Sequence, residues 1–233
     1  MRNVWTARRN RIVSIAGIAI LCALPVLAQE TVLKLTETPP PAELAQALRD
    51  ALDTKAVQLS IGDKPIFEFW FRKDIPLTAK PASGQTALDS IKEVTFLGAV
   101  RVHETRKDFR KDDIEKGVYT LRLGIIPQDG NHLGTTPFPY MAVLVPAKYD
   151  TAMDAITDHD TLAKTSGKDT YDEHPNTLSM QPLKGAEGEG EFPRLAEGGD
   201  DWKFIYLKLP AKTESGETAD LIFGLVYEGH GEV

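Results

Sequence analysis

Five histidines are the side chains in this sequence best suited to bind a transition metal. They are His103, His132, His159, His174 and His230. None forms a His-x-His or His-x-x-x-His pair, so no single strand or helix presents two of them at a familiar ligand spacing. His103, His132 and His174 fall at a predicted strand end or in turn-rich loops. If these three meet at one rim of the fold, their neutral imidazoles would hold copper, zinc or iron. The alternative, which we favour, is that each is a solvated or locally bonded loop residue.

Calcium is the second cofactor that the residue pattern suggests. Asp129 and Asn131 flank a glycine directly before His132 and offer two oxygen ligands. No acid stands at the closing position of a twelve-residue calcium loop, and Asp-Gly-Asn is also an ordinary turn sequence. We favour the turn, and Asp129 and Asn131, together with Phe109, are the candidate ligand-binding loop residues.

Motifs for covalent catalysis and nucleotide binding are absent from the sequence. There is no Gly-x-Ser-x-Gly elbow, no Gly-x-x-x-x-Gly-Lys-Ser/Thr loop and no Gly-x-Gly-x-x-Gly. The only cysteine is Cys22. We therefore expect a non-enzymatic protein.

Residues 101–116 form a dense run of charges of both signs. The run is either a docking surface for an anionic partner or a solvated hairpin tip, and its near balance of charge favours the tip. Phe109 is an aromatic residue among these charges, so it either anchors the loop or contacts a partner.

The first 28 residues have the pattern of a secretory signal peptide. Four arginines and no acid accompany an apolar run over residues 12–24, and Ala28 ends a Val-x-Ala cleavage pattern. Removal of this leader would leave 205 residues without a thiol, and the net charge would fall from −7 to −11. We expect a periplasmic or extracellular protein with no membrane span after cleavage. Its acidity argues against a nucleic-acid partner.

The elements that must position the candidate residues are mostly strands. Alternating or continuous apolar residues predict strands over residues 56–61, 66–71, 91–104, 117–126, 139–145, 202–209 and 219–227, with a bend at Gly98. Short helices are predicted over residues 41–52 and, capped by Asp150, over 151–164. The pattern indicates an all-β protein, a β-sandwich of Ig-like or jelly-roll type with one or two short peripheral helices.

The predicted organisation has three parts. Residues 1–28 are the signal peptide, residues 29–41 are a polar, proline-rich linker, and residues 42–233 form one β-sandwich domain. A helical and loop insertion is expected at about residues 147–199, a stretch that is rich in polar residues and glycine.

One stretch of the chain resembles a known group of proteins. Residues 116–129 read Lys-Gly-Val-Tyr-Thr-Leu-Arg-Leu-Gly-Ile-Ile-Pro-Gln-Asp, and residues 142–146 read Ala-Val-Leu-Val-Pro. This strand, proline turn and second strand resemble uncharacterised bacterial secreted β-sandwich proteins, the hypothetical exported proteins of planctomycete-type bacteria. The resemblance implies a β-sandwich and export, and it implies no activity and no ligand.

Two functional hypotheses follow from these residues. The first is an exported, non-enzymatic domain that binds an envelope or extracellular protein, or a small ligand, through loops at residues 128–139 and 171–175. The second is a metalloprotein with a site built from His132, His174 and His103.

Overall fold

The computed structural model describes residues 29–82, 86–126, 138–183, 185–199 and 201–229. Strands make up most of its regular structure, beside two short α-helices, α1 (Gln46–Asp50) and α2 (His159–Ser166). This confirms the predicted all-β class with short helices. None of the helices in the described ranges has the length and apolar character needed to cross a membrane.

Eleven strands within the described residues join in one sheet, in which all neighbours are antiparallel except β4 and β12. The first six strands along this sheet are β1 (Thr31–Thr36), β2 (Ala56–Ile61), β3 (Lys64–Phe71), β5 (Phe96–Val102), β8 (Gly117–Ile125) and β9 (Tyr140–Pro146). The others are β10 (Thr177–Pro182), β13 (Thr218–Glu228), β12 (Lys203–Thr213) and β11 (Arg194–Glu197), with β4 (Ile75–Leu77) beside β12.

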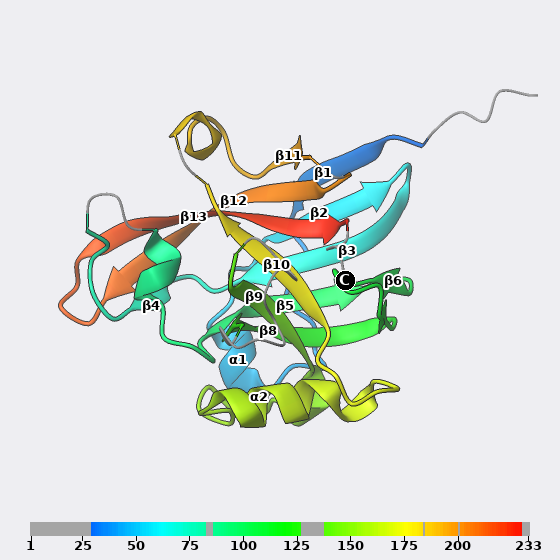
Figure 1. The fold of residues 1–233 in the computed structure, drawn as a ribbon, viewed down its shortest axis with the longest axis horizontal. Helices are drawn as coiled ribbons and strands as arrows, with labels where there is room; N and C mark the ends of the chain where they lie inside the picture. The colour runs from blue at the N-terminus through cyan, green and yellow to red at the C-terminus, as the bar shows by residue number, and fades with distance from the viewer. Residues whose placement is uncertain (1–28, 83–85, 127–137, 184, 200, 230–233) are drawn as a thin grey trace, which may run out of the picture.

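Strand β10 connects the two halves of this sheet. Its residues 177–179 pair with β9, whereas its residues 180–182 pair with β13. The sheet curls (Figure 1) until Thr31 of β1 lies beside Tyr227 of β13. The described strands thus form one continuous, curled sheet rather than two separate sheets.

One main hydrophobic core lies inside this curled sheet. Both halves contribute to it, with Phe69 and Leu121 from the first half and Ile205 and Phe223 from the second. Alternate residues of each strand point inward, so the core is a direct consequence of the period-two pattern of the sequence. Gly98 allows β5 to approach β3 closely, because a Cβ atom there would lie 2.4 Å from the backbone oxygen of Trp70.

Three smaller clusters cover the outer face of the sheet. Helix α1 packs Leu48 against Trp70, and α2 packs Leu162 against Val143. The third cluster places Phe109 against β12 and β13. Phe109 belongs to the turn of a small hairpin made by β6 (Arg106–Lys107) and β7 (Asp113–Ile114).

Four short 3₁₀ helices complete the described chain. They are η1 (Ala87–Ser90), η2 (Ala147–Tyr149), η3 (Gly167–Asp169) and η4 (Gly185–Gly188). Of these, η2 continues β9 and η3 continues α2, so both lie beside the outer face of the sheet.

Some boundaries differ from the predictions. Residues 31–36, predicted as part of a linker, form β1 because β2 offers them a full ladder of backbone hydrogen bonds. The helix expected over residues 151–164 begins instead at His159, capped by Asp158, whose carboxylate accepts a hydrogen bond from the N–H of Thr161 at 2.9 Å. The predicted insertion at about residues 147–199 contains β10 and β11, which are members of the sheet.

Asp150 does not cap a helix but forms a buried ion pair with Arg122 of β8. Arg122 Nε lies 2.7 Å from Asp150 Oδ2, and Arg122 Nη2 lies 2.8 Å from Asp150 Oδ1. The two side chains are 1% and 0% exposed. The Thr120 hydroxyl donates a further hydrogen bond to Asp150 Oδ2.

The guanidinium of Arg122 also donates to three backbone carbonyls. Nη1 reaches the oxygens of Val94 at 2.9 Å and Met153 at 3.2 Å, and Nη2 reaches that of Ala152 at 2.9 Å. All five N–H groups of this side chain are therefore satisfied, which is what burial of a charged group requires. Val94 has a positive φ of 63°, an unfavourable conformation for a β-branched residue, and the bond to Arg122 helps to hold it.

The substitution Asp150→Asn tests this pair. It leaves the guanidinium buried without its counter-charge, so the free energy of unfolding should fall by about 3–5 kcal/mol. The matched control is Asp220→Asn, which breaks the exposed Lys208–Asp220 pair, 2.7 Å long, and should cost less than about 1 kcal/mol. Urea unfolding followed by circular dichroism measures both values, and equal losses would contradict this account.

Candidate functional site

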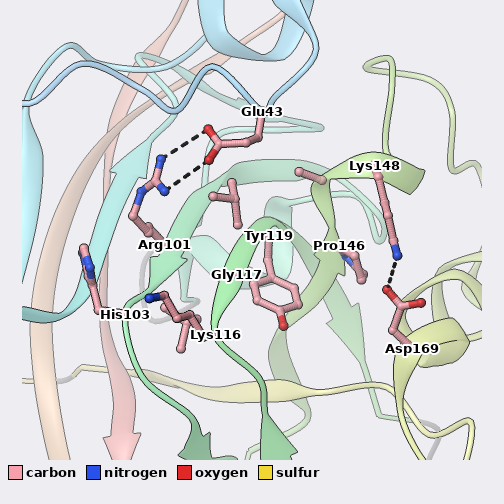
Figure 2. A pocket seen from close by; sticks show the side chains of 12 residues that line it. Glu43, Arg101, His103, Lys116, Gly117, Tyr119, Pro146, Lys148 and Asp169 are labelled. Atoms are coloured by element: carbon pink, nitrogen blue, oxygen red, sulfur yellow. Dashed lines mark hydrogen bonds and ion pairs between the residues drawn. The ribbon is translucent and has the colours of Figure 1, made fainter.

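A pocket of about 580 Å³ lies on the outer face of the sheet. It opens where β5 ends, β8 begins and β9 passes into η2 (Figure 2). Its charged side chains and its one histidine come from five separate stretches of chain: Glu43; Arg101 and His103; Lys116; Lys148; and Asp169. We call this hollow the outer pocket.

The register of two strands brings the ends of the charged run together in the outer pocket. Arg101 of β5 pairs with Val118 of β8, and Val102 pairs with Gly117. Arg101 and Lys116, fifteen positions apart in the sequence, therefore border the same hollow. The intervening hairpin extends away from these two strand ends.

Two of the cations in the outer pocket are already paired. Arg101 Nη1 and Nη2 lie 3.2 and 3.3 Å from Glu43 Oε1 and Oε2. A backbone hydrogen bond, with a contribution from Arg101, lowers the pKa of the Glu43 carboxyl. Across the pocket, Lys148 Nζ lies 2.9 Å from Asp169 Oδ2, and this contact lowers the pKa of the Asp169 carboxyl (Figure 2).

Lys116 is the cation that remains without a counter-charge. Its ammonium group has neither an ion pair nor a hydrogen-bond acceptor among the residues that the structure describes. The adjacent Glu115 is directed to the hydroxyl of Thr105, at 2.9 Å. The lining residues of the outer pocket thus include three cations and two acids, on a chain whose net charge is −7.

His103 borders the outer pocket with a fixed ring orientation. Its Nε2 lies 2.8 Å from Glu68 Oε2, and the Glu68 side chain is largely buried beneath it. Glu68 is placed on β3 directly opposite Arg101 of β5. The carboxylate therefore holds the imidazole beside the guanidinium, and Nδ1 makes no hydrogen bond to the described part of the chain.

The remaining wall of the outer pocket is apolar. Tyr119, Val118, Pro146 and Ala147 line it. The Tyr119 hydroxyl donates to the Glu115 carbonyl oxygen at 2.8 Å, and burial raises the pKa of Tyr119 to about 12, so the ring stays neutral. A Cβ atom at position 117 would lie 3.3 Å from the Tyr119 ring, so glycine there leaves room for this largely buried ring.

The structure describes two of the three histidines of the predicted metal site, His103 and His174. His103 is held by Glu68, whereas Nδ1 of His174 lies 3.3 Å from the backbone oxygen of Pro175. Burial, and secondarily Arg110, lowers the pKa of His174. Within the described ranges no group of three or more His, Cys, Asp or Glu side chains is placed to hold a metal ion. His132, with Asp129 and Asn131, lies outside the described residues.

Phe109 anchors its hairpin rather than facing a partner. It is 5% exposed, and its ring meets that of Trp202 edge-on with centroids 5.0 Å apart. Phe204 and Tyr206 of β12 complete the cluster. Of the two roles that the sequence left open for Phe109, the structure supports the anchor.

The sequence signal for the outer pocket was the charged run itself, for which a docking surface for an anionic partner was the less favoured of two interpretations. Arg101 and Lys116 stand at its two ends, but the run gave no reason to select them from the charges between. Glu43, Lys148 and Asp169 carry no motif and lie far along the chain from the run. Only the pairing of strands and the placement of η2 and η3 collect these residues.

The residue before Phe109 leads to a pH-dependent prediction. Asp108 is almost fully buried, and its Oδ1 accepts hydrogen bonds from the N–H groups of Arg110 and Asp112 at 2.8 and 3.0 Å. Burial raises its pKa from 3.8 to about 6. The folded protein therefore binds a proton here more tightly than the unfolded chain does, so this contribution to stability is complete below pH 3.8 and is lost as the pH rises through about 6.

Asp108→Asn should remove that loss, since asparagine resembles the protonated acid. The stability of the variant relative to the original protein should rise by about 2–3 kcal/mol between about pH 4 and about pH 7.5. Urea unfolding of both proteins at the two pH values measures this difference. A difference that does not change with pH would contradict the burial of the charged carboxylate.

Scans against protein-family models, curated proteins and solved structures found no match to this chain.

Proposed function

We propose that this protein is an exported, non-enzymatic binding protein that takes a small organic anion in the outer pocket. The observation that carries the proposal is the unpaired ammonium group of Lys116 at the rim of a concave, partly apolar hollow. Export remains a prediction from the sequence, based on the signal-peptide pattern of residues 1–28.

The shape of the outer pocket supports a small ligand rather than a protein surface. Its volume of about 580 Å³ falls in the range of small-molecule sites, and its lining combines apolar side chains with a few placed polar groups. The neighbouring loop candidate Phe109, which would suit a protein partner, is buried in the fold.

The charges of the outer pocket support an anion. Any negative group that enters meets Lys116 without first displacing a carboxylate, whereas Arg101 and Lys148 are each held by an acid. The rest of the chain is acidic, so the surplus positive charge is a local feature. A local cation on an acidic protein attracts small anions but not an extended polyanion.

Replacement of Lys116 by glutamine tests the proposal. A small carboxylate that binds the outer pocket should lose about tenfold in affinity, because the charge-assisted hydrogen bond to the ammonium group is gone. Titrations followed by ligand-observed NMR, with benzoate, citrate, glucuronate and inorganic phosphate as probes, measure the effect.

Lys208→Gln serves as the matched control, since Lys208 lies on β12 and pairs with Asp220 away from the outer pocket. This control should bind as the original protein does. Addition of about 0.5 M NaCl should weaken the binding of the anion to the original protein. The same addition should change its affinity for Lys116→Gln very little. If none of the four anions binds at concentrations up to about 10 mM, the proposed function is wrong.

A further inference from the structure

The two ion pairs in the walls of the outer pocket indicate what kind of anion it takes. Glu43 holds Arg101 through both guanidinium Nη atoms, and Asp169 holds Lys148 while it also accepts a bond from the Tyr149 hydroxyl. A second carboxylate on a ligand would have to break one of these pairs to find a free cation. A ligand with several negative charges therefore gains little beyond its first contact with Lys116.

A hydroxyl group suits these walls better than a second charge. Each pair presents carboxylate lone pairs that can accept a hydrogen bond and N–H groups that can donate one, and all four side chains are partly exposed. A hydroxyl both donates and accepts, so it can bond to the carboxylate and the cation of one pair without separating them. Each wall therefore offers both a donor and an acceptor to a hydroxyl of a ligand.

Between the walls, the ligand meets apolar side chains, those of Val118, Pro146 and Ala147. Figure 2 shows Pro146 between the two ion pairs. C–H groups of a saturated ring pack favourably on such a surface. The fixed imidazole of His103 adds one polar contact at the side nearest Arg101.

From these three features we infer that the ligand is an acidic saccharide, a sugar ring that bears one carboxylate. The carboxylate pairs with Lys116, the hydroxyls bond to the Arg101–Glu43 and Lys148–Asp169 pairs, and the C–H edge of the ring lies on Val118, Pro146 and Ala147. This inference rests on the proposed function, since it names the class of anion for the same site.

Three matched probes separate the features. Methyl β-D-glucuronoside has the ring, the hydroxyls and the carboxylate. Methyl β-D-glucoside lacks the carboxylate, and cyclohexanecarboxylate lacks the hydroxyls. Isothermal titration with the original protein should show the glucuronoside binding at least about tenfold more tightly than either of the other two.

The variant Glu43→Gln gives a second readout. It leaves Arg101 without its counter-charge, so cyclohexanecarboxylate should bind several-fold more tightly and the preference for the glucuronoside over this probe should narrow. Lys116→Gln should weaken the glucuronoside about tenfold and leave the glucoside unchanged. Glu43 and Lys116 are both exposed, and thermal unfolding of each variant checks that the fold is retained.

The outcomes distinguish the inference from the proposed function. If cyclohexanecarboxylate binds as tightly as the glucuronoside and both depend on Lys116, the site binds anions but the saccharide assignment is overturned. If neither carboxylate binds, or if the glucoside binds as well as the glucuronoside, Lys116 does not select an anion and both proposals fail.

Discussion

The ion pair between Arg122 and Asp150 is the interaction on which the outer face of this protein depends. It connects the middle of β8 to the residue that follows η2, and its carbonyl contacts extend to Val94, Ala152 and Met153. A buried guanidinium with every N–H satisfied has one geometry available to it, because any displacement leaves a charged donor without an acceptor. The path of the chain after β9 is thereby determined, and with it the position of Lys148, two residues before Asp150.

The outer pocket follows from that constraint together with the closure of the sheet. Strands β5 and β8 supply Arg101 and Lys116 through their register, and η2 supplies Lys148. The 3₁₀ turn after α2 then brings Asp169 to Lys148 at 2.9 Å. Two of the three cations are neutralised locally, so the selectivity we propose comes from the difference between paired and unpaired charge rather than from a large positive field.

The sequence predicted most of the strands because their signal is local. The predicted strand over residues 56–61 coincides with β2, and that over 117–126 differs from β8 by one residue. Strand β1 was missed because Leu35 is exposed and the neighbouring residues are polar, so its partner β2 decides its structure. Asp150 was taken for a helix cap because an acid before a helical pattern has that local meaning, and no local pattern reveals a partner 28 positions away.

By itself, the sequence determined the all-β class, the central strands and the presence of a charged hairpin with an aromatic residue at its turn. Alternation of apolar residues is a property of neighbouring positions, so these features need no knowledge of the folded chain. Tertiary structure alone decided that Phe109 is an anchor, that Arg122 is buried against Asp150, and which cation of the outer pocket stays unpaired. These features depend on which charged groups are desolvated together and paired. Desolvation and pairing are decided only when segments distant in the sequence pack against each other.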